Sequence, residues 1–449
     1  MKKDFNKFLL CCIVIFSIIH IGCRHERGNV DENKEEIVTN ESSDDTIAVG
    51  EIKFKFFLEN SGSMWGYEGL GTDGDFKLAI TKLLNTIPER KTGKNMLYIV
   101  NNEIHNFDKT YKDFITSGDI YSDIKSIGDP KYTDFKTIFD SIMSNTMEDE
   151  LSIFVSDLTY STKDMAVKNN VRILGEAKSL TESVFKEYSN KDIVIIKLLS
   201  DFNGSYYVYN QPCGGHQYKG LRPYYIMLFA TPRVMDEIFT NDNYKEFRNF
   251  EGLKNYQDYY LFACKNRKNP FYTILTGNAK NRSTSMKAEK NKQEDGAVHG
   301  VEKISPTRTG DYYITLAVDL RDYFMKEEVK TNPENYIVSS KNNFEIDEIV
   351  PIEEGMIAQN EKNLVGSATH LIILHTNDAV RTEEITIEMP NRLPDWIGKS
   401  STDDDTKMGL DSDFQNKTFG LKYICEGIHE AYYGTAETPL YFKLSIKVK

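Results

Sequence analysis

The sequence predicts an α/β protein, with an N-terminal doubly wound, mostly parallel sheet followed by a β-rich or mixed α+β C-terminal domain. Two observations support this fold class. Up to about residue 245, short apolar runs alternate with amphipathic helical stripes, which is typical of a sheet with helices on both faces. From about residue 255, apolar runs follow one another and only one clear helical stripe remains.

The N-terminus predicts an export signal over residues 1–23. Lys2 and Lys3 precede an almost wholly apolar run, residues 8–21, that is short for a membrane-spanning helix. A glycine and then Cys23 follow this run, and the arrangement resembles a bacterial lipoprotein signal. An ordinary signal peptide or a membrane anchor with an incidental cysteine are the alternatives.

The resemblance to lipoprotein signals implies lipidation of Cys23 and an acyl anchor in a bacterial membrane. The expected location is the cell envelope, facing the periplasm or the cell surface, with the outer membrane favoured. Residues 24–50 are polar and charged without apolar periodicity, so we expect a flexible tether between the lipid and the folded part.

Composition restricts the partners. The formal net charge of −13 disfavours a nucleic-acid partner, because the phosphate backbone would be repelled.

One disulfide could form among Cys213, Cys264 and Cys425, and the sequence leaves the pairing open.

We expect the first domain to span residues 51–245 and to alternate strands with helices. Apolar runs predict the strands, and apolar residues at i, i+3, i+4 and i+7 predict the first two helices, while the third is expected as a polar helix. The expected strands are 52–58, 96–100, 151–155, 193–199 and 224–229, and the expected helices are 76–87, 135–143 and 168–188.

The segment 200–225 separates the last two of these strands. Its glycines, asparagines and tyrosines do not suit a crossover helix, and they favour a β-hairpin. Asn203-Gly204 is expected to form its turn.

Oxygen-bearing side chains follow the predicted strands. Glu59, Ser61 and Ser63 lie just past the first strand, Thr133 precedes a helix, and Asp157 follows another strand. Ligands of such sheets bind outside the carboxyl ends of the strands, so these loops can meet at one edge. Five oxygens, two of them carboxylate, suit Mg²⁺ or Mn²⁺ and would leave a position that a partner's carboxylate could fill.

The run Glu59-Asn-Ser-Gly-Ser-Met64, the loop threonine and Ser156-Asp157 together resemble a von Willebrand factor A domain over residues 51–245. The resemblance implies a metal-ion-dependent adhesion site, built from an Asp-x-Ser-x-Ser motif, a loop threonine and a loop aspartate. Glu59 stands where the family has its first aspartate. The extra methylene moves the carboxylate outward, so a retained fold with an empty metal site is the alternative.

The second half, residues 255–449, is expected to be a β-sandwich or a mixed α+β domain. The expected strands are 259–263, 272–275, 312–318, 344–350, 370–374, 385–389 and 441–448, with one helix at 417–433.

These features predict a lipoprotein that mediates protein–protein recognition or assembly through a divalent ion. One alternative is a structural scaffold with a degenerate metal site, which binds its partners through the C-terminal domain. A metal-assisted phosphoester hydrolase with Ser61 as nucleophile is the other. We expect no enzyme, because neither G-x-S-x-G nor a phosphate-binding loop is present.

Overall fold

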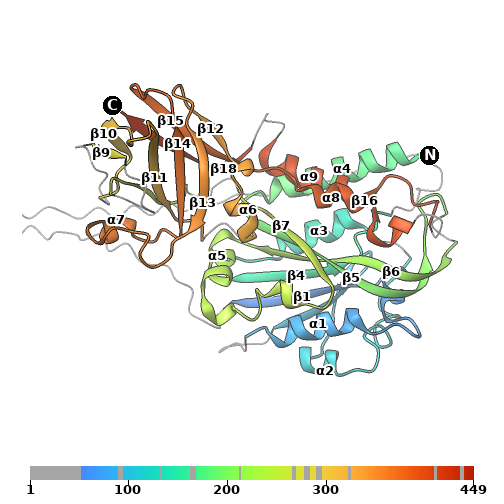
Figure 1. Cartoon of the computed structure of the whole chain (residues 1–449). Helices are drawn as coiled ribbons and strands as arrows, with labels where there is room; N and C mark the ends of the chain where they lie inside the picture. The colour runs from blue at the N-terminus through green and yellow to red at the C-terminus, as the bar shows by residue number, and fades with distance from the viewer. Residues whose placement is uncertain are drawn as a thin grey trace, which may run out of the picture. The chain divides into compact units, whose positions relative to one another are not determined.

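The structure is a computed structural model, shown in Figure 1. The expected signal, the tether and Cys23 lie outside the described residues, as does Cys213. The described residues are 52–88, 95–131, 133–161, 168–211, 214–264, 269–277, 284–289, 296–321, 325–408, 412–434 and 439–449.

A seven-stranded mixed sheet in the order β3-β2-β1-β4-β6-β5-β7 forms the first half. Only the β1–β2 and β1–β4 pairs are parallel, and the other four pairs are antiparallel. The expectation of a mostly parallel sheet is therefore wrong outside its three central strands. The strands are β1 (Lys53–Glu59), β2 (Met96–Val100), β3 (Ile104–Asn106), β4 (Glu150–Ser156), β5 (Asp192–Tyr206), β6 (His216–Ala230) and β7 (Tyr256–Phe262).

Helices cover both faces of this sheet, and a separate apolar core lies under each set (Figure 1). In β1, Phe54, Phe56 and Leu58 face the core under α1, α2 and α5, while Phe57 faces the core under α3, α4 and α9. Burial on both faces explains why the strand is an almost continuous apolar run. The helices are α1 (Asp75–Asn85), α2 (Tyr111–Ile115), α3 (Phe135–Ser144), α4 (Asn170–Glu187), α5 (Pro232–Thr240) and α9 (Leu421–Tyr433).

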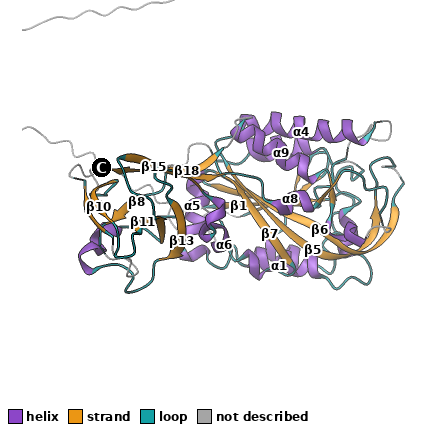
Figure 2. Ribbon diagram, turned by 45° about the horizontal axis from the view of Figure 1, so that its top comes forward, coloured by secondary structure: helices purple, strands orange, loops and turns teal. Residues whose placement is uncertain are grey.

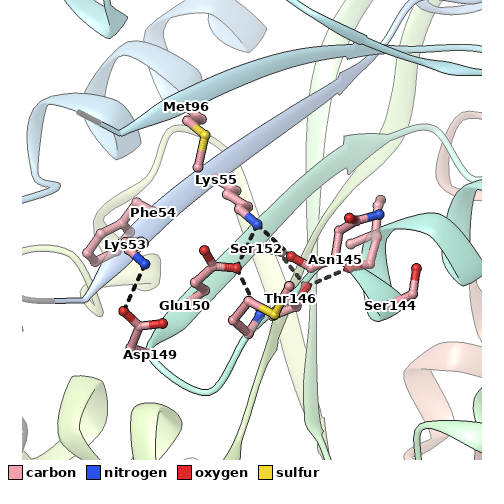
Figure 3. Close-up of polar contacts among 12 residues, drawn as sticks. Lys53, Phe54, Lys55, Met96, Ser144, Asn145, Thr146, Asp149, Glu150 and Ser152 are labelled. Atoms are coloured by element: carbon pink, nitrogen blue, oxygen red, sulfur yellow. Dashed lines mark hydrogen bonds and ion pairs between the residues drawn. The ribbon is translucent and has the colours of Figure 1, made fainter. Parts of the chain in front are cut away.

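A buried ion pair joins the amino-terminal halves of β1 and β4. Lys55 interrupts the apolar run of β1, yet it is only 7% exposed. Its ammonium lies 2.6 Å from a carboxylate oxygen of Glu150 and donates to the carbonyl of Asn145 at 2.5 Å (Figure 3). Lys53 pairs with Asp149 nearby, at 3.1 Å. A slip of either strand would separate Lys55 from Glu150, so the pair favours the observed register.

The expected hairpin is confirmed, but its turn lies elsewhere. β5 and β6 are each 15 residues long, and they pair as far as Tyr206 opposite His216. Asn203 and Gly204 therefore lie inside β5. Gly204 is required for close packing, because a Cβ there would lie 2.6 Å from the Cα of Gly66.

Two further sheets pack face to face in the second half, with one apolar core between them. The expected β-rich character is present, and the short strands β9, β10 and β12 were not predicted. The five-stranded sheet contains β12 (Ile337–Ser339), β15 (Glu383–Pro390), β18 (Leu440–Val448), β10 (Gly300–Ser305) and β9 (Ser285–Ala288); the four-stranded sheet contains β13 (Glu345–Pro351), β14 (His370–Thr376), β11 (Tyr312–Val318) and β8 (Tyr272–Leu275).

Some elements beyond residue 255 belong to the first sheet and its layers, among them one strand and one long helix. The strand expected at 259–263 is β7, which pairs with β5 instead of joining the sandwich. The C-terminal helix α9 lies beside α4, as Figure 2 shows. The division expected between residues 245 and 255 stays a prediction, and residues 46–449 form one unit by their contacts.

Two expectations about cysteines and membranes can be compared with the described residues. Cys264 and Cys425 are both buried, and they do not form a disulfide with each other. Within the ranges given above, none of the helices is both long and apolar enough to cross a bilayer.

Packing of α9 on α4 predicts the effect of two glycine substitutions. A Cβ at Gly427 would lie 2.5 Å from the carbonyl oxygen of Lys178, so Gly427→Ala must push the helices apart. We expect a loss of about 1–3 kcal/mol in the free energy of unfolding, measured by urea denaturation. Gly175 on α4 has open space, and Gly175→Ala should instead stabilise by about 0.5–1 kcal/mol. Equal effects of the two variants would contradict this packing.

Candidate metal site

The carboxyl ends of β1 and β4 place the expected loops at one edge of the sheet. The two strands are parallel neighbours, with Leu58 opposite Val155. Glu59 ends β1, and Ser156 ends β4 immediately before Asp157. β2 and β4 flank β1 on opposite sides, so the connections from β1 to its two neighbours lead to opposite edges of the sheet. Such positions are where ligands bind in open α/β sheets.

The Glu59 carboxylate is buried and bonded to two hydroxyl groups. Glu59 as a whole is 1% exposed. Thr133 donates a hydrogen bond to one carboxylate oxygen and Ser156 donates to the other. Thr133 was an expected ligand, whereas the hydroxyl of Ser156 was not. The sequence contained a signal for this hydroxyl group, because Ser156 ends an apolar strand directly before Asp157.

The serine loop lies between β1 and the 3-10 helix η1 (Met64–Glu68). The hydroxyl oxygens of Ser61 and Ser63 are 3.0 Å apart. Asn60 holds the loop in place, because its side-chain amide donates to the carbonyls of Ile124 and Ile127 at 2.6 and 3.1 Å. The loop therefore holds both serines near the end of β1.

The aromatic residues after the serines pack inside the protein. Trp65 donates from its indole nitrogen to Asn60 Oδ1 at 2.9 Å, and it is half-buried. Tyr67 is fully buried, and its hydroxyl donates to the carbonyl of Pro223 at 2.5 Å. These contacts make Tyr67 part of the core under the loop.

Asp157 lies in a tightly bonded turn after β4. It is 2% exposed, its Oδ1 accepts the backbone N–H of Thr159 at 2.9 Å, and its own N–H lies 3.2 Å from the sulfur of Met64. The next residue, Leu158, is buried and has a φ of 50°. This left-handed conformation is unfavourable for a leucine, and such strain concentrates at functional sites.

The two carboxylates influence each other strongly. Burial, and then the charge of Asp157, raise the pKa of Glu59 to about 7, although hydrogen bonds from Ser156, Thr133 and Ser61 lower it. Neither carboxylate takes part in any ion pair formed among the residues with defined positions. The buried charge of Arg222 interacts with Asp157 and offsets part of this negative charge, and a proton or a bound cation would offset the rest.

A second buried charge, Arg222 on β6, was missed by the sequence reasoning. It is 1% exposed and contacts the rings of both Tyr206 and Phe414, with its guanidinium carbon 4.5 and 4.7 Å from the two ring centres. It donates to the carbonyl of Lys417 at 2.9 Å. Although burial alone would lower it, Tyr206, Tyr67 and Asp157 raise the pKa of Arg222. The sequence signal for a buried cation was a single arginine directly before the apolar run of β6.

The chemistry of these side chains fits a hard divalent cation. All five expected residues, Glu59, Ser61, Ser63, Thr133 and Asp157, lie in the loops at this edge and supply only oxygen atoms. Within the described ranges, no group of three or more His, Cys, Asp and Glu side chains could hold a metal. A cation here would therefore depend on the hydroxyl oxygens as well as the two carboxylates.

Comparisons with protein-family models, curated proteins and solved structures found no match for this chain.

The raised pKa of Glu59 predicts a pH-dependent stability without divalent cations. Between pH 4.5 and about 7 the folded protein holds a proton that the unfolded chain has lost. The resulting stabilisation is complete below pH 4.5 and is lost as the pH rises through 7. Relative to Glu59→Gln, the wild type should lose up to about 3 kcal/mol of stability from pH 4.5 to pH 8.

Urea unfolding in EDTA at pH 4.5, 6 and 8 measures this difference. Glu187→Gln, at an exposed position on α4, is the matched control and should track the wild type at every pH. A wild-type minus Glu59→Gln difference that does not change with pH would show that Glu59 has an ordinary pKa.

Proposed function

We propose that this chain is a lipid-anchored protein of the cell envelope that recognises a protein partner through a divalent cation, Mg²⁺ or Mn²⁺. The ligands are the side chains of Glu59, Ser61, Ser63, Thr133 and Asp157. The observation that supports this function best is the buried carboxylate pair beside hydroxyl groups at the carboxyl ends of two parallel strands. The anchor is Cys23, and no nucleic-acid partner is proposed.

Each side chain has a distinct part in this proposal. Glu59 and Asp157 supply negative charge, while Thr133, Ser61 and Ser63 supply neutral oxygens. Ser156 orients the Glu59 carboxylate by its hydrogen bond. When bound, the cation would supply positive charge and an open position for an acidic side chain of the partner.

We also propose that the first half is a von Willebrand factor A-like domain with an altered sheet. Support comes from the parallel strands β2, β1 and β4 and from the loops that follow them. The antiparallel β6 lies between β4 and β5, so the sheet departs from a simple doubly wound arrangement. The likeness is therefore proposed for the central strands and their loops.

A structural scaffold with a degenerate metal site is the second candidate. It is favoured by the hydrogen bonds that occupy both oxygens of Glu59, because a cation would have to replace these contacts. The loop is also close to the β5–β6 hairpin, since a Cβ at Gly62 would lie 3.0 Å from the Tyr207 hydroxyl. In this case partners would bind through the C-terminal sandwich.

Capture of envelope proteins on the immobilised protein distinguishes the two functions. With Mg²⁺ or Mn²⁺ present, the wild type should retain a partner that EDTA releases. Ser63→Ala removes one expected ligand and should reduce capture at least tenfold. Ser144→Ala, at an exposed position on α3, is the matched control and should capture normally. Capture that persists in EDTA and in Ser63→Ala would instead support the scaffold.

A further inference from the structure

A cavity of about 310 Å³ lies away from the carboxylate site, against β5 and β7. The short helix α8 (Asp395–Lys399) and the 3-10 helix η8 (Ser412–Asn416) contribute the rest of its wall. Four segments of the chain therefore form the cavity, and two of them, α8 and η8, are close in sequence. Its lining residues are Lys197, Gln257, Asp258, Trp396, Lys399, Ser400, Asp413, Asn416 and Lys417.

Lys197 is a buried cation in the wall of this cavity. It lies within β5, it is 7% exposed, and its ammonium donates to Ser400 Oγ at 2.7 Å and to the Asn416 carbonyl at 3.2 Å. An ammonium group has three donors, so two neutral acceptors leave one donor over. Burial of a charged amine is costly unless an opposite charge accompanies it.

The carboxylate opposite Lys197 is paired with another cation. Asp258 is the register partner of Lys197 across β5 and β7. Its carboxylate lies 3.0 Å from the ammonium of Lys326, and Lys197 forms no ion pair within the described residues. Burial lowers the pKa of Lys197 to about 8, although Asp258 opposes this effect. Lys197 is therefore a cation that a bound anion would stabilise.

Other groups around the cavity are also hydrogen-bond donors. Lys417 and Lys399 line it, and the ammonium of Lys399 also lies 3.4 Å from a carboxylate oxygen of Asp395. Asp258 and Asp413 are the acidic groups in the wall. The lysines outnumber the acids here, although the whole chain has a formal net charge of −13.

We propose that this cavity binds a small organic anion, whose carboxylate or phosphate group pairs with Lys197 beside the side chain of Trp396. A second cavity of about 460 Å³ shares Asp258 and Trp396 with the first. It is lined in part by Leu261 and Met389, so the uncharged part of a ligand can extend toward it. This site is independent of the divalent cation and of the partner proposed above.

Calorimetric titration of the purified protein with inorganic phosphate, acetate and succinate tests this proposal. At pH 7 at least one of these anions should bind, and the fluorescence of Trp396 should change with the same midpoint. Binding of phosphate alone would assign a phosphate ligand, and binding of acetate or succinate alone a carboxylate ligand. Affinity should fall as the pH rises from 7 to 9.5, because burial lowers the pKa of Lys197 to about 8 and the ammonium then loses its proton. The other charged groups around it are Lys399, Lys417, Asp413 and the Asp258–Lys326 pair.

Lys197→Met should weaken binding at least tenfold. Lys417→Met keeps the buried lysine and should weaken it less, which guards against a folding defect in the first variant. Lys186→Met, at an exposed position on α4, removes the same charge elsewhere and should bind normally. Trp396→Phe leaves Trp65 as the remaining one of two tryptophans and should abolish the fluorescence change. No binding of any of the three anions to the wild type, or equal binding to Lys197→Met, would overturn the proposal.

Discussion

Burial of the Glu59 and Asp157 carboxylates at one edge of the sheet is the constraint on which the rest of the site depends. Two neighbouring charges in a region of low dielectric repel each other, and water cannot solvate them fully. Hydroxyl groups of Thr133 and Ser156 satisfy the oxygens of Glu59, but a neutral hydroxyl does not cancel a charge. The buried guanidinium of Arg222 offsets part of this charge, and a proton or a cation would balance the rest. This choice links pH, metal binding and stability.

The fold creates this constraint through the register of two strands. β1 and β4 run parallel, so Glu59 and Ser156 end up together at their carboxyl ends. At the amino ends the buried pair of Lys55 and Glu150 favours the same alignment. A polar interaction at one end of the sheet thus helps to position the carboxylates at the other.

Local patterns predicted the elements, and non-local pairing decided the rest. The apolar run of β1 and the stripes of α1 and α3 were readable, because burial on one or both faces imposes a period. The hairpin signal predicted that β6 runs antiparallel to β5, but no local signal places β6 between β4 and β5. For the same reason β7 and α9 were assigned to the second half, although both contact the first.

The meeting of the five expected residues at one edge was more predictable than the sheet around them. The five expected ligands each follow a strand or precede a helix, and this placement alone brings them to one edge. Arg222 and Lys197 were missed because each is a single charge beside or inside an apolar run. Only the tertiary structure shows that their side chains are buried.

The most direct test of the cation site is calorimetric titration of Mg²⁺ and Mn²⁺ into the fragment 47–449, beside a Glu59→Ala variant. We predict saturable binding to the wild type, with release of protons near pH 6.5 as Glu59 ionises, and loss of this binding in the variant. Absence of binding to the wild type, or unchanged binding to Glu59→Ala, would contradict the assignment of Glu59 as a ligand.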